Sequence, residues 1–449
     1  MKRVFSRITA AILISMSLTA CGPSTEGIKA VSGNVRVMTA MPSEGGSYSM
    51  GITELLALDD LSTLAGKFVK FFFSPRVRNN HLEGMSPKTR FVLNSDGVYV
   101  PTDETTMQMV TIYAHMQKLA ALDEELGAGG VNKWPRDVGI AVRVAGSTRN
   151  NAFYEGKTDS ILVVPYTGKE LPLAVNGGVL AHEHFHSLFY KLVIKDAATN
   201  VHGKEIADTF GEDFGQISDV EASRIQPVGP TLSSSEMNYF YHVAITRGLN
   251  EGLADFWGWM YTGDPDFIVH SLPGETGRTL KVSRNQTFLS SDVSIRGELN
   301  RRYNERSGDK NFDFTNQISG YVYVLGTQFS RAIKVYTEVY AKARAVEPLQ
   351  ARKDVAKVII KMLPSLREEL SQSETKIFTG QTFVESFAKN TQLATQEECQ
   401  YLANLINDSR NGGSRNVTEC QENQGQWTFH EKRIEIGPRV DPDIKGLTQ

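Results

Sequence analysis

Two histidines and a glutamate, His182, Glu183 and His186, have the types and the spacing of a metal site. Residues four apart lie on one face of a helix, so both imidazoles can bind one cation. Glu183 lies beside that face, where it would polarise a water molecule and not bind the metal. The flanking residues 178–181 and 188–190 are apolar, which predicts a buried helix. A polar helix face with hydrogen-bonded histidines is the alternative.

A third ligand is needed, because a catalytic zinc ion takes three protein ligands and keeps a fourth position for water. Glu251 is the predicted ligand, since it lies in an apolar helical stretch, 249–259, that has little other reason to carry acidic residues. Asp255 follows four residues later and would accept the second ring N–H of a ligand histidine. His184 lies about 200° round the helix from His182, so it is not expected to bind the metal. An acidic surface edge is the alternative for the second helix.

The order of these motifs resembles that of the thermolysin-like and fungalysin-like gluzincins, which are zinc metallopeptidases. In those families His-Glu-x-x-His on one helix is followed by Asn-Glu-x-x-Ala/Ser-Asp-x-x-Gly on the next. This sequence has matching residues at Asn250, Glu251, Ala254, Asp255 and Gly258. The resemblance implies one Zn²⁺ bound by His182, His186 and Glu251, with Asp255 and Asn250 supporting the ligands.

A third match lies at 150–156, followed by the apolar strand 161–165. It resembles the thermolysin family's edge-strand segment, whose asparagine and alanine bind the substrate backbone. The resemblance implies that Asn151 and Ala152 hold an extended peptide. We expect this peptide to add to the strand at 161–164 through main-chain hydrogen bonds.

A hydrogen-bond donor for the oxyanion of the tetrahedral intermediate is also needed, and we assign Tyr323 to this role. Tyr323 precedes Gly326 by three residues, which resembles the Tyr-x-x-Gly of gluzincin aminopeptidases. A phenol can donate without titrating at neutral pH. The rival donors are Tyr321, Tyr241 and His242. Those aminopeptidases also carry Gly-x-Met-Glu-Asn, which is absent from the sequence, so an endopeptidase is favoured.

The N-terminus predicts export as a lipoprotein. Three basic residues flank or precede an apolar run, 8–18, that is too short to span a bilayer. The Leu-x-Ala-Cys sequence that ends at Cys21 resembles a bacterial lipobox, which implies removal of 1–20 and a membrane anchor on Cys21. Gly22 favours the outer membrane of a Gram-negative bacterium, facing the periplasm or the cell surface. A plain secretory signal is the alternative.

The composition is that of an ordinary globular protein, with 22% charged and 40% hydrophobic residues. The formal net charge is −3 and there is no basic patch, so nothing indicates a nucleic-acid partner. Besides Cys21 the sequence has only Cys399 and Cys420. In an oxidising compartment this pair is expected to form a disulfide, with two free thiols as the alternative.

The predicted fold class is α+β, with a gluzincin-like catalytic domain that has a mixed sheet and an edge strand over the active-site helix, followed by a mainly helical subdomain. The predicted divisions are a signal peptide at 1–20, a Gly/Ser-rich tether at 21–60, a β-rich segment at 61–104, a catalytic domain at 105–345 and a helical region with a polar tail at 346–449. A loop-rich insertion, which could form a lid, is expected over about 194–236.

Together these features predict a zinc-dependent metalloendopeptidase that acts on a peptide or protein substrate, with a zinc-activated water and Glu183 as the general base. The first alternative is a non-catalytic surface lipoprotein that retains the fold as a binding module. The second is a gluzincin aminopeptidase. Whether the protein binds Ca²⁺ is left undecided, because no aspartate-rich loop matches a recognisable calcium site.

Overall fold

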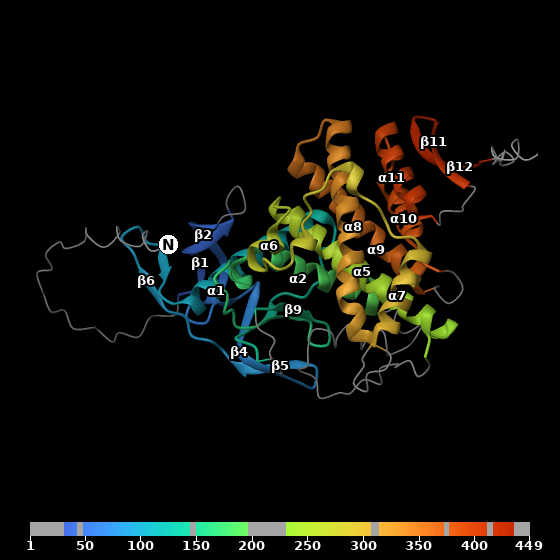
Figure 1. Ribbon diagram of the computed structural model, residues 1–449. Helices are drawn as coiled ribbons and strands as arrows, with labels where there is room; N and C mark the ends of the chain where they lie inside the picture. Colours follow the sequence, from blue (N-terminus) through green and yellow to red (C-terminus); the bar gives the residue numbers. More distant parts are fainter. Residues whose placement is uncertain are drawn as a thin grey trace, which may run out of the picture.

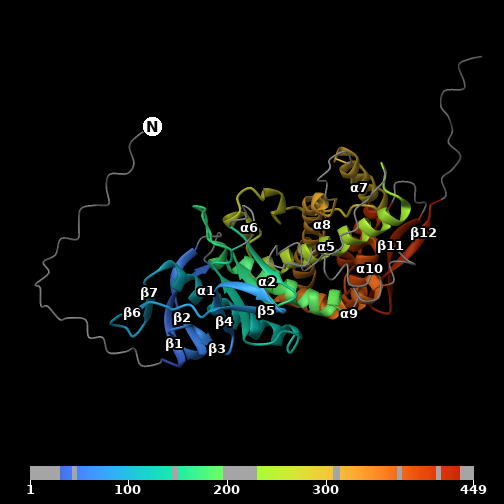
Figure 2. The same ribbon diagram turned by 90° about the horizontal axis from the view of Figure 1, so that it is seen from below.

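The computed structural model describes residues 31–42, 48–143, 150–195, 230–306, 314–371, 377–410 and 416–434. The described residues form an α+β fold, which confirms the predicted class. The strands that precede residue 164 gather at one end of the molecule, and most helices lie at the other end with a C-terminal hairpin, while α2 (Gly177–Phe189) and α5 (Ser234–Thr262) lie between the two ends (Figures 1 and 2).

The first sheet has five strands in the order β3-β2-β1-β7-β6. Its strands are β1 (Gly33–Pro42), β2 (Tyr48–Asp60), β3 (Ala65–Gly66), β6 (Phe91–Leu93) and β7 (Tyr99–Pro101). Helix α1 (Glu104–Leu126) packs on this sheet, where the Gln117 side chain bonds the main chain of Leu56 and Glu54 at 2.9 and 2.8 Å. The sheet is thereby tied to the helical part of the fold.

The expectation of a tether over 21–60 is wrong for the described residues 33–42 and 48–60, because β1 and β2 lie there. Val37 and Leu55 on these strands are completely buried. An antiparallel pair can bury one face against a helix and leave the other face in water, so a polar, Gly-rich composition is compatible with a strand. Strands form here, and not the expected tether, because these two residues are buried in the same hydrophobic core as α1.

The second sheet has the order β5-β4-β8-β10-β9. Its strands are β4 (Val69–Arg78), β5 (His81–Met85), β8 (Arg136–Ile140), β9 (Ala152–Glu155) and β10 (Ser160–Val163). β10 pairs with β8 on one side and with β9 on the other. The expectation that a peptide adds to 161–164 is therefore wrong, since both sides of that strand are occupied. The edge beside α2 is β9.

Helix α2 lies against α5, and α5 lies against α8 (Phe314–Arg344). Gly252 on α5 and Gly326 on α8 meet at the second contact, where a Cβ on Gly252 would overlap the carbonyl group of Gly326. Only a residue without a Cβ permits this approach of the two backbones. The remaining described helical segments are η2 (Leu173–Val175), η3 (Tyr190–Ile194), α6 (Phe267–Ser271), η4 (Thr276–Arg278), η5 (Arg284–Gln286), α7 (Asp292–Arg306), α9 (Pro348–Ser371), α10 (Gly380–Thr391) and α11 (Gln396–Ser409).

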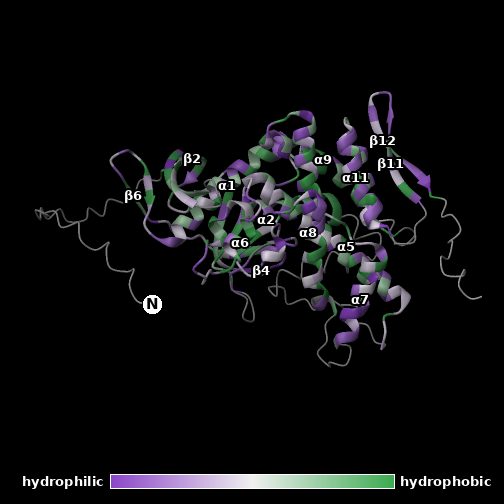
Figure 3. Cartoon of the chain, turned by 45° about the horizontal axis from the view of Figure 1, so that its top comes forward, coloured by the Kyte–Doolittle hydropathy of each residue, from purple (hydrophilic) through white to green (hydrophobic). Residues whose placement is uncertain are grey.

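The chain's described part ends in a hairpin, β11 (Asn416–Asn423) and β12 (Gln426–Arg433), which Figure 3 shows as largely hydrophilic. A disulfide joins Cys399 on α11 to Cys420 on β11 and confirms the predicted pair. The predicted signal peptide with Cys21, and most of the predicted insertion, at 196–229, lie outside the described residues. Among the helices that are described, none is long and apolar enough to cross a membrane.

Candidate metal centre

Helix α2 begins at a strong cap and carries the first motif. The Asn176 side chain accepts hydrogen bonds from the N–H groups of Gly178 and Val179, at 3.0 and 3.3 Å, and so satisfies two donors at the helix start. All thirteen residues of the helix are buried, including His182 and His186. The prediction of a buried helix over this motif is confirmed.

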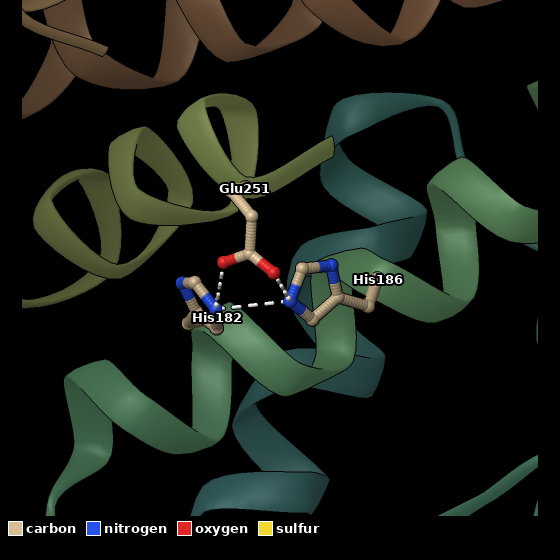
Figure 4. A group of neighbouring side chains, drawn as sticks. All are labelled: His182, His186 and Glu251. Atoms are coloured by element: carbon tan, nitrogen blue, oxygen red, sulfur yellow. Dashed lines mark hydrogen bonds and ion pairs between the residues drawn. The ribbon is translucent and has the colours of Figure 1, made fainter. Parts of the chain in front are cut away.

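Helix α5 brings Glu251 to the two histidines. One ligand atom from each of the three residues lies within 4.8 Å of the others. The two Nε2 atoms are 2.9 Å apart, and they lie 3.5 Å (His182) and 3.9 Å (His186) from the nearer Glu251 carboxylate oxygens. Figure 4 shows the Glu251 carboxylate pointing from α5 at both rings on α2. The three predicted ligands therefore form one group that could hold a metal ion.

The outer ring nitrogens of both histidines have partners on α5. His182 Nδ1 lies 2.9 Å from Asp255 Oδ1, and His186 Nδ1 lies 2.9 Å from Asn250 Oδ1. Such partners fix the tautomer of a metal-binding imidazole and raise its basicity. Both Nε2 atoms are thereby directed at the space beside Glu251. Two imidazole nitrogens and one carboxylate form a donor set that suits zinc, so the residues fit the predicted ion.

The three ligand residues have shifted pKa values, which bear on how a cation would bind. Burial opposes ionisation of Glu251, but His186, His182 and Arg278 outweigh it and lower the pKa of Glu251 to about 2. Burial, together with the His182 charge, lowers the pKa of His186 to about 4. At neutral pH Glu251 is therefore ionised and His186 is neutral, which are the forms that bind a metal. Burial opposes protonation of His182, but its hydrogen bonds to Asp255 and Glu251 outweigh burial and raise its pKa to about 10, so metal binding here would release a proton from His182.

Glu183 lies beside the ligands and faces the same pocket. Its Oε2 accepts a hydrogen bond from the Tyr154 main-chain N–H at 2.9 Å, which ties it to the edge strand β9. Burial raises the pKa of Glu183 to about 8, against the opposing charge of His182. A carboxylate whose pKa lies near the operating pH suits a general base that also returns its proton.

A partly buried polar cluster holds strand β9 to the end of α2. The Tyr154 hydroxyl donates to Asp159 at 3.0 Å, and Asp159 also pairs with Arg136 at 2.9 Å and with Lys191 at 2.7 Å. Lys191 belongs to η3, directly after α2. This cluster connects the edge strand to the helix that carries Glu183, so it fixes the distance between them.

A pocket of about 120 Å³ opens onto the ligand group. Asn151 and Ala152 line it together with His182, Glu183 and Glu251, and Tyr323 belongs to the same lining. Its apolar wall consists of Leu173, Val179, Phe267, Ile268 and Leu272. The structure therefore brings the predicted substrate-binding segment and the predicted oxyanion donor to the candidate metal centre.

Arg278 is the residue of the site that the sequence analysis missed. It donates through Nη2 and Nε to the two Asp255 carboxylate oxygens, at 2.6 and 3.2 Å, and lies 3.4 Å from Glu251. Its guanidinium also lies 4.4 Å from the centre of the Tyr323 ring. Arg278 ends the short helix η4, which has no periodicity and no motif, so no local signal in the sequence points to it.

Tyr323 stays protonated at neutral pH, because the charge of Glu251 and burial raise its pKa well above the usual value. Two of its rivals have other contacts: the Tyr321 ring lies 5.3 Å from the Arg302 guanidinium, and the Tyr241 hydroxyl donates to the Phe378 carbonyl. His242 is buried on α5 and does not line the pocket.

His184, the remaining histidine of the motif, turns away from the ligand group as expected. Its Nε2 lies 2.9 Å from Asp123 Oδ1 on α1, and its ring stacks with Trp134. This contact joins α2 to α1 and explains why a third histidine occurs between the two ligands.

No match to a family model or to a curated protein assigns a function to this site. No protein-family model matches the chain, and no curated protein matches its sequence. The functional conclusion therefore depends on the geometry of the described residues.

Proposed function

We propose that this chain is a zinc-dependent metalloendopeptidase. The observation that carries the proposal is the meeting of three features at one pocket: the ligand triad of His182, His186 and Glu251, the buried carboxylate of Glu183, and the Asn151–Ala152 end of an edge strand. Metal-assisted peptide hydrolysis needs a metal site, a base and a means of holding an extended substrate, and residues at this site support each of them.

Zinc bound to the triad would lower the pKa of a water molecule and polarise the carbonyl of the scissile bond. Glu183 takes a proton from the attacking water and returns it to the leaving amine. Its contact with the Tyr154 N–H leaves the other carboxylate oxygen for this exchange. Tyr323, which also lines the pocket, supplies a donor for the negative charge that develops on the carbonyl oxygen.

Substrate would lie along β9 and not along β10. Main-chain groups alternate in direction along an antiparallel strand, and the Tyr154 N–H points away from β10 towards Glu183. Ala152, two residues earlier, presents its main-chain groups on the same side. An extended peptide can bond there while the Asn151 side chain holds its backbone.

We also propose that the enzyme is exported as a lipoprotein through Cys21 and acts at the outer membrane. The support is the Leu-x-Ala-Cys sequence after a short apolar run. Metabolic labelling with a fatty acid, in the native chain and in Cys21→Ser, tests this part separately from catalysis.

The test of catalysis compares Glu183→Gln with the native chain. The substitution keeps size but removes the base, so zinc content should stay at one per chain while casein cleavage falls by about 100-fold or more. Glu305→Gln, at an exposed position on α7, is the matched control and should retain activity. Activity of Glu183→Gln within tenfold of the native value, or native activity that a chelator does not abolish, would contradict the proposal.

A further inference from the structure

A second, larger pocket of about 420 Å³ adjoins the metal pocket. It lies between the segment that contains η4 and η5 and one face of α8. Arg278 and Tyr323 line both pockets. Because the Arg278 guanidinium lies 4.4 Å from the Tyr323 ring centre, one stacked pair of side chains forms the wall that the pockets share.

We propose that this second pocket binds a large apolar side chain of the same peptide whose scissile bond lies at the metal centre. The inference rests on the proposed function, which it deepens by naming the class of substrate. An extended chain advances about 3.3 Å per residue, so a peptide anchored at the metal can reach a neighbouring subsite within one or two residues.

The apolar character of the pocket comes from Phe288 and Val324. Their side chains are 54% and 50% exposed, which leaves two large hydrophobic groups in contact with water at the mouth of a concavity. An apolar side chain that covers these two residues removes apolar surface of both the pocket and the peptide from water. The hydrophobic effect, which also buries the core of a protein, therefore favours an apolar occupant.

The two arginines of the pocket do not favour an acidic occupant, and the third charged residue of the lining, Glu275, is exposed to water. Arg278 is paired with Asp255 and Glu251. Arg331 donates through Nε and Nη2 to the carbonyls of Thr279 and Gly277, at 2.9 Å each, and so holds the η4 segment on α8. Polar atoms that are already bonded offer little to a new charge, while desolvating that charge has a cost.

The test measures binding and does not require turnover. The zinc-loaded Glu183→Gln chain is titrated with blocked octapeptides in which one position at a time is alanine, phenylalanine, glutamate or lysine. We expect one position at which phenylalanine binds about tenfold or more tightly than alanine, glutamate or lysine. Val324→Arg fills the pocket and should remove that preference.

Val293→Arg is the matched control, since Val293 is also an exposed helical valine, at 60%, but lies on α7 outside both pockets. It should leave the preference unchanged. Phe288→Ala is a second variant, which should reduce the preference at the same position. No preferred position, a preference for glutamate, or a preference that survives Val324→Arg would overturn the inference.

The two proposals fail in different ways. If the native chain cleaves no peptide but the phenylalanine preference responds to Val324→Arg, hydrolysis is wrong and the pocket assignment stands. If the native chain cleaves peptides with chelator sensitivity and no position shows the preference, the pocket assignment is wrong and hydrolysis stands.

Discussion

Replacement of Asp255 by asparagine is the most informative change at the candidate metal centre. Asp255 Oδ1 is shared by His182 Nδ1 at 2.9 Å and Arg278 Nη2 at 2.6 Å, while Oδ2 accepts from Arg278 Nε at 3.2 Å. An asparagine has one acceptor oxygen and one amide nitrogen that donates. Whichever way the amide is turned, its nitrogen faces a donor, either the His182 ring N–H or the Arg278 guanidinium.

The expected loss in zinc affinity is about 10–100-fold, the usual effect of losing a hydrogen-bond partner of a metal ligand. This corresponds to about 1.4–2.8 kcal/mol of binding free energy. The carboxylate's negative charge, which makes the His182 imidazole more basic, is lost at the same time. The helix itself should remain intact, because asparagine has nearly the same volume as aspartate.

Zinc affinity is measured by competition with a chromogenic chelator, with circular dichroism as the check on folding. Asp264→Asn is the matched control, since Asp264 Oδ2 lies 2.8 Å from His270 Nε2 in an Asp–His pair that does not belong to the ligand group. Its zinc affinity should match that of the native chain. A folded Asp255→Asn chain that binds zinc within threefold of the native affinity would refute the assigned role.

Three further outcomes are expected. Tyr323→Phe should keep full zinc content and lose about 100–1000-fold in kcat, whereas undiminished turnover would move the donor role to another residue. Burial lowers the pKa of His115 to about 3, so the folded chain takes up a proton less readily than the unfolded chain. As the pH is lowered from 6.5 to 3, this group should therefore reduce the free energy of unfolding by about 1.4 kcal/mol per pH unit. In urea titrations of His115→Gln, the free energy of unfolding should lack this part of its dependence on pH. Replacing Cys399 and Cys420 by serine should reduce the free energy of unfolding by about 3 kcal/mol, and an unchanged thermal midpoint would contradict this.

The ligand group was predictable because each half of it is local. His182 and His186 are brought together by the geometry of one helix turn, and so are Glu251 and Asp255. The pairing of the two helices needed the resemblance, since nothing local relates residues so far apart in the chain. The expectation that Asp255 accepts the outer ring N–H of a ligand histidine followed from the chemistry of imidazole ligands, and the structure identifies this histidine as His182, at 2.9 Å.

The parts of the fold and of the site that could not be predicted depend on residues that only the folded chain brings together. Arg278 belongs to the site only because the η4 segment is held on α8 by Arg331. The segment of β9 was matched to an edge strand by resemblance alone, and the peptide was placed on the apolar run 161–164, because a strand of four residues gives a weak local signal. β1 and β2 were missed because a strand with one buried face needs only a few apolar residues.

The contact between Gly252 and Gly326 divides the centre into two parts with separate tasks. The metal ligands and the partners of the two histidines belong to α2 and α5, whereas Tyr323 and Val324 on α8 form one side of the second pocket. The two parts meet through backbone at this point, not through interlocking side chains. A change at Val324 on α8 can therefore alter which peptides are recognised while the three ligands on α2 and α5 keep their places.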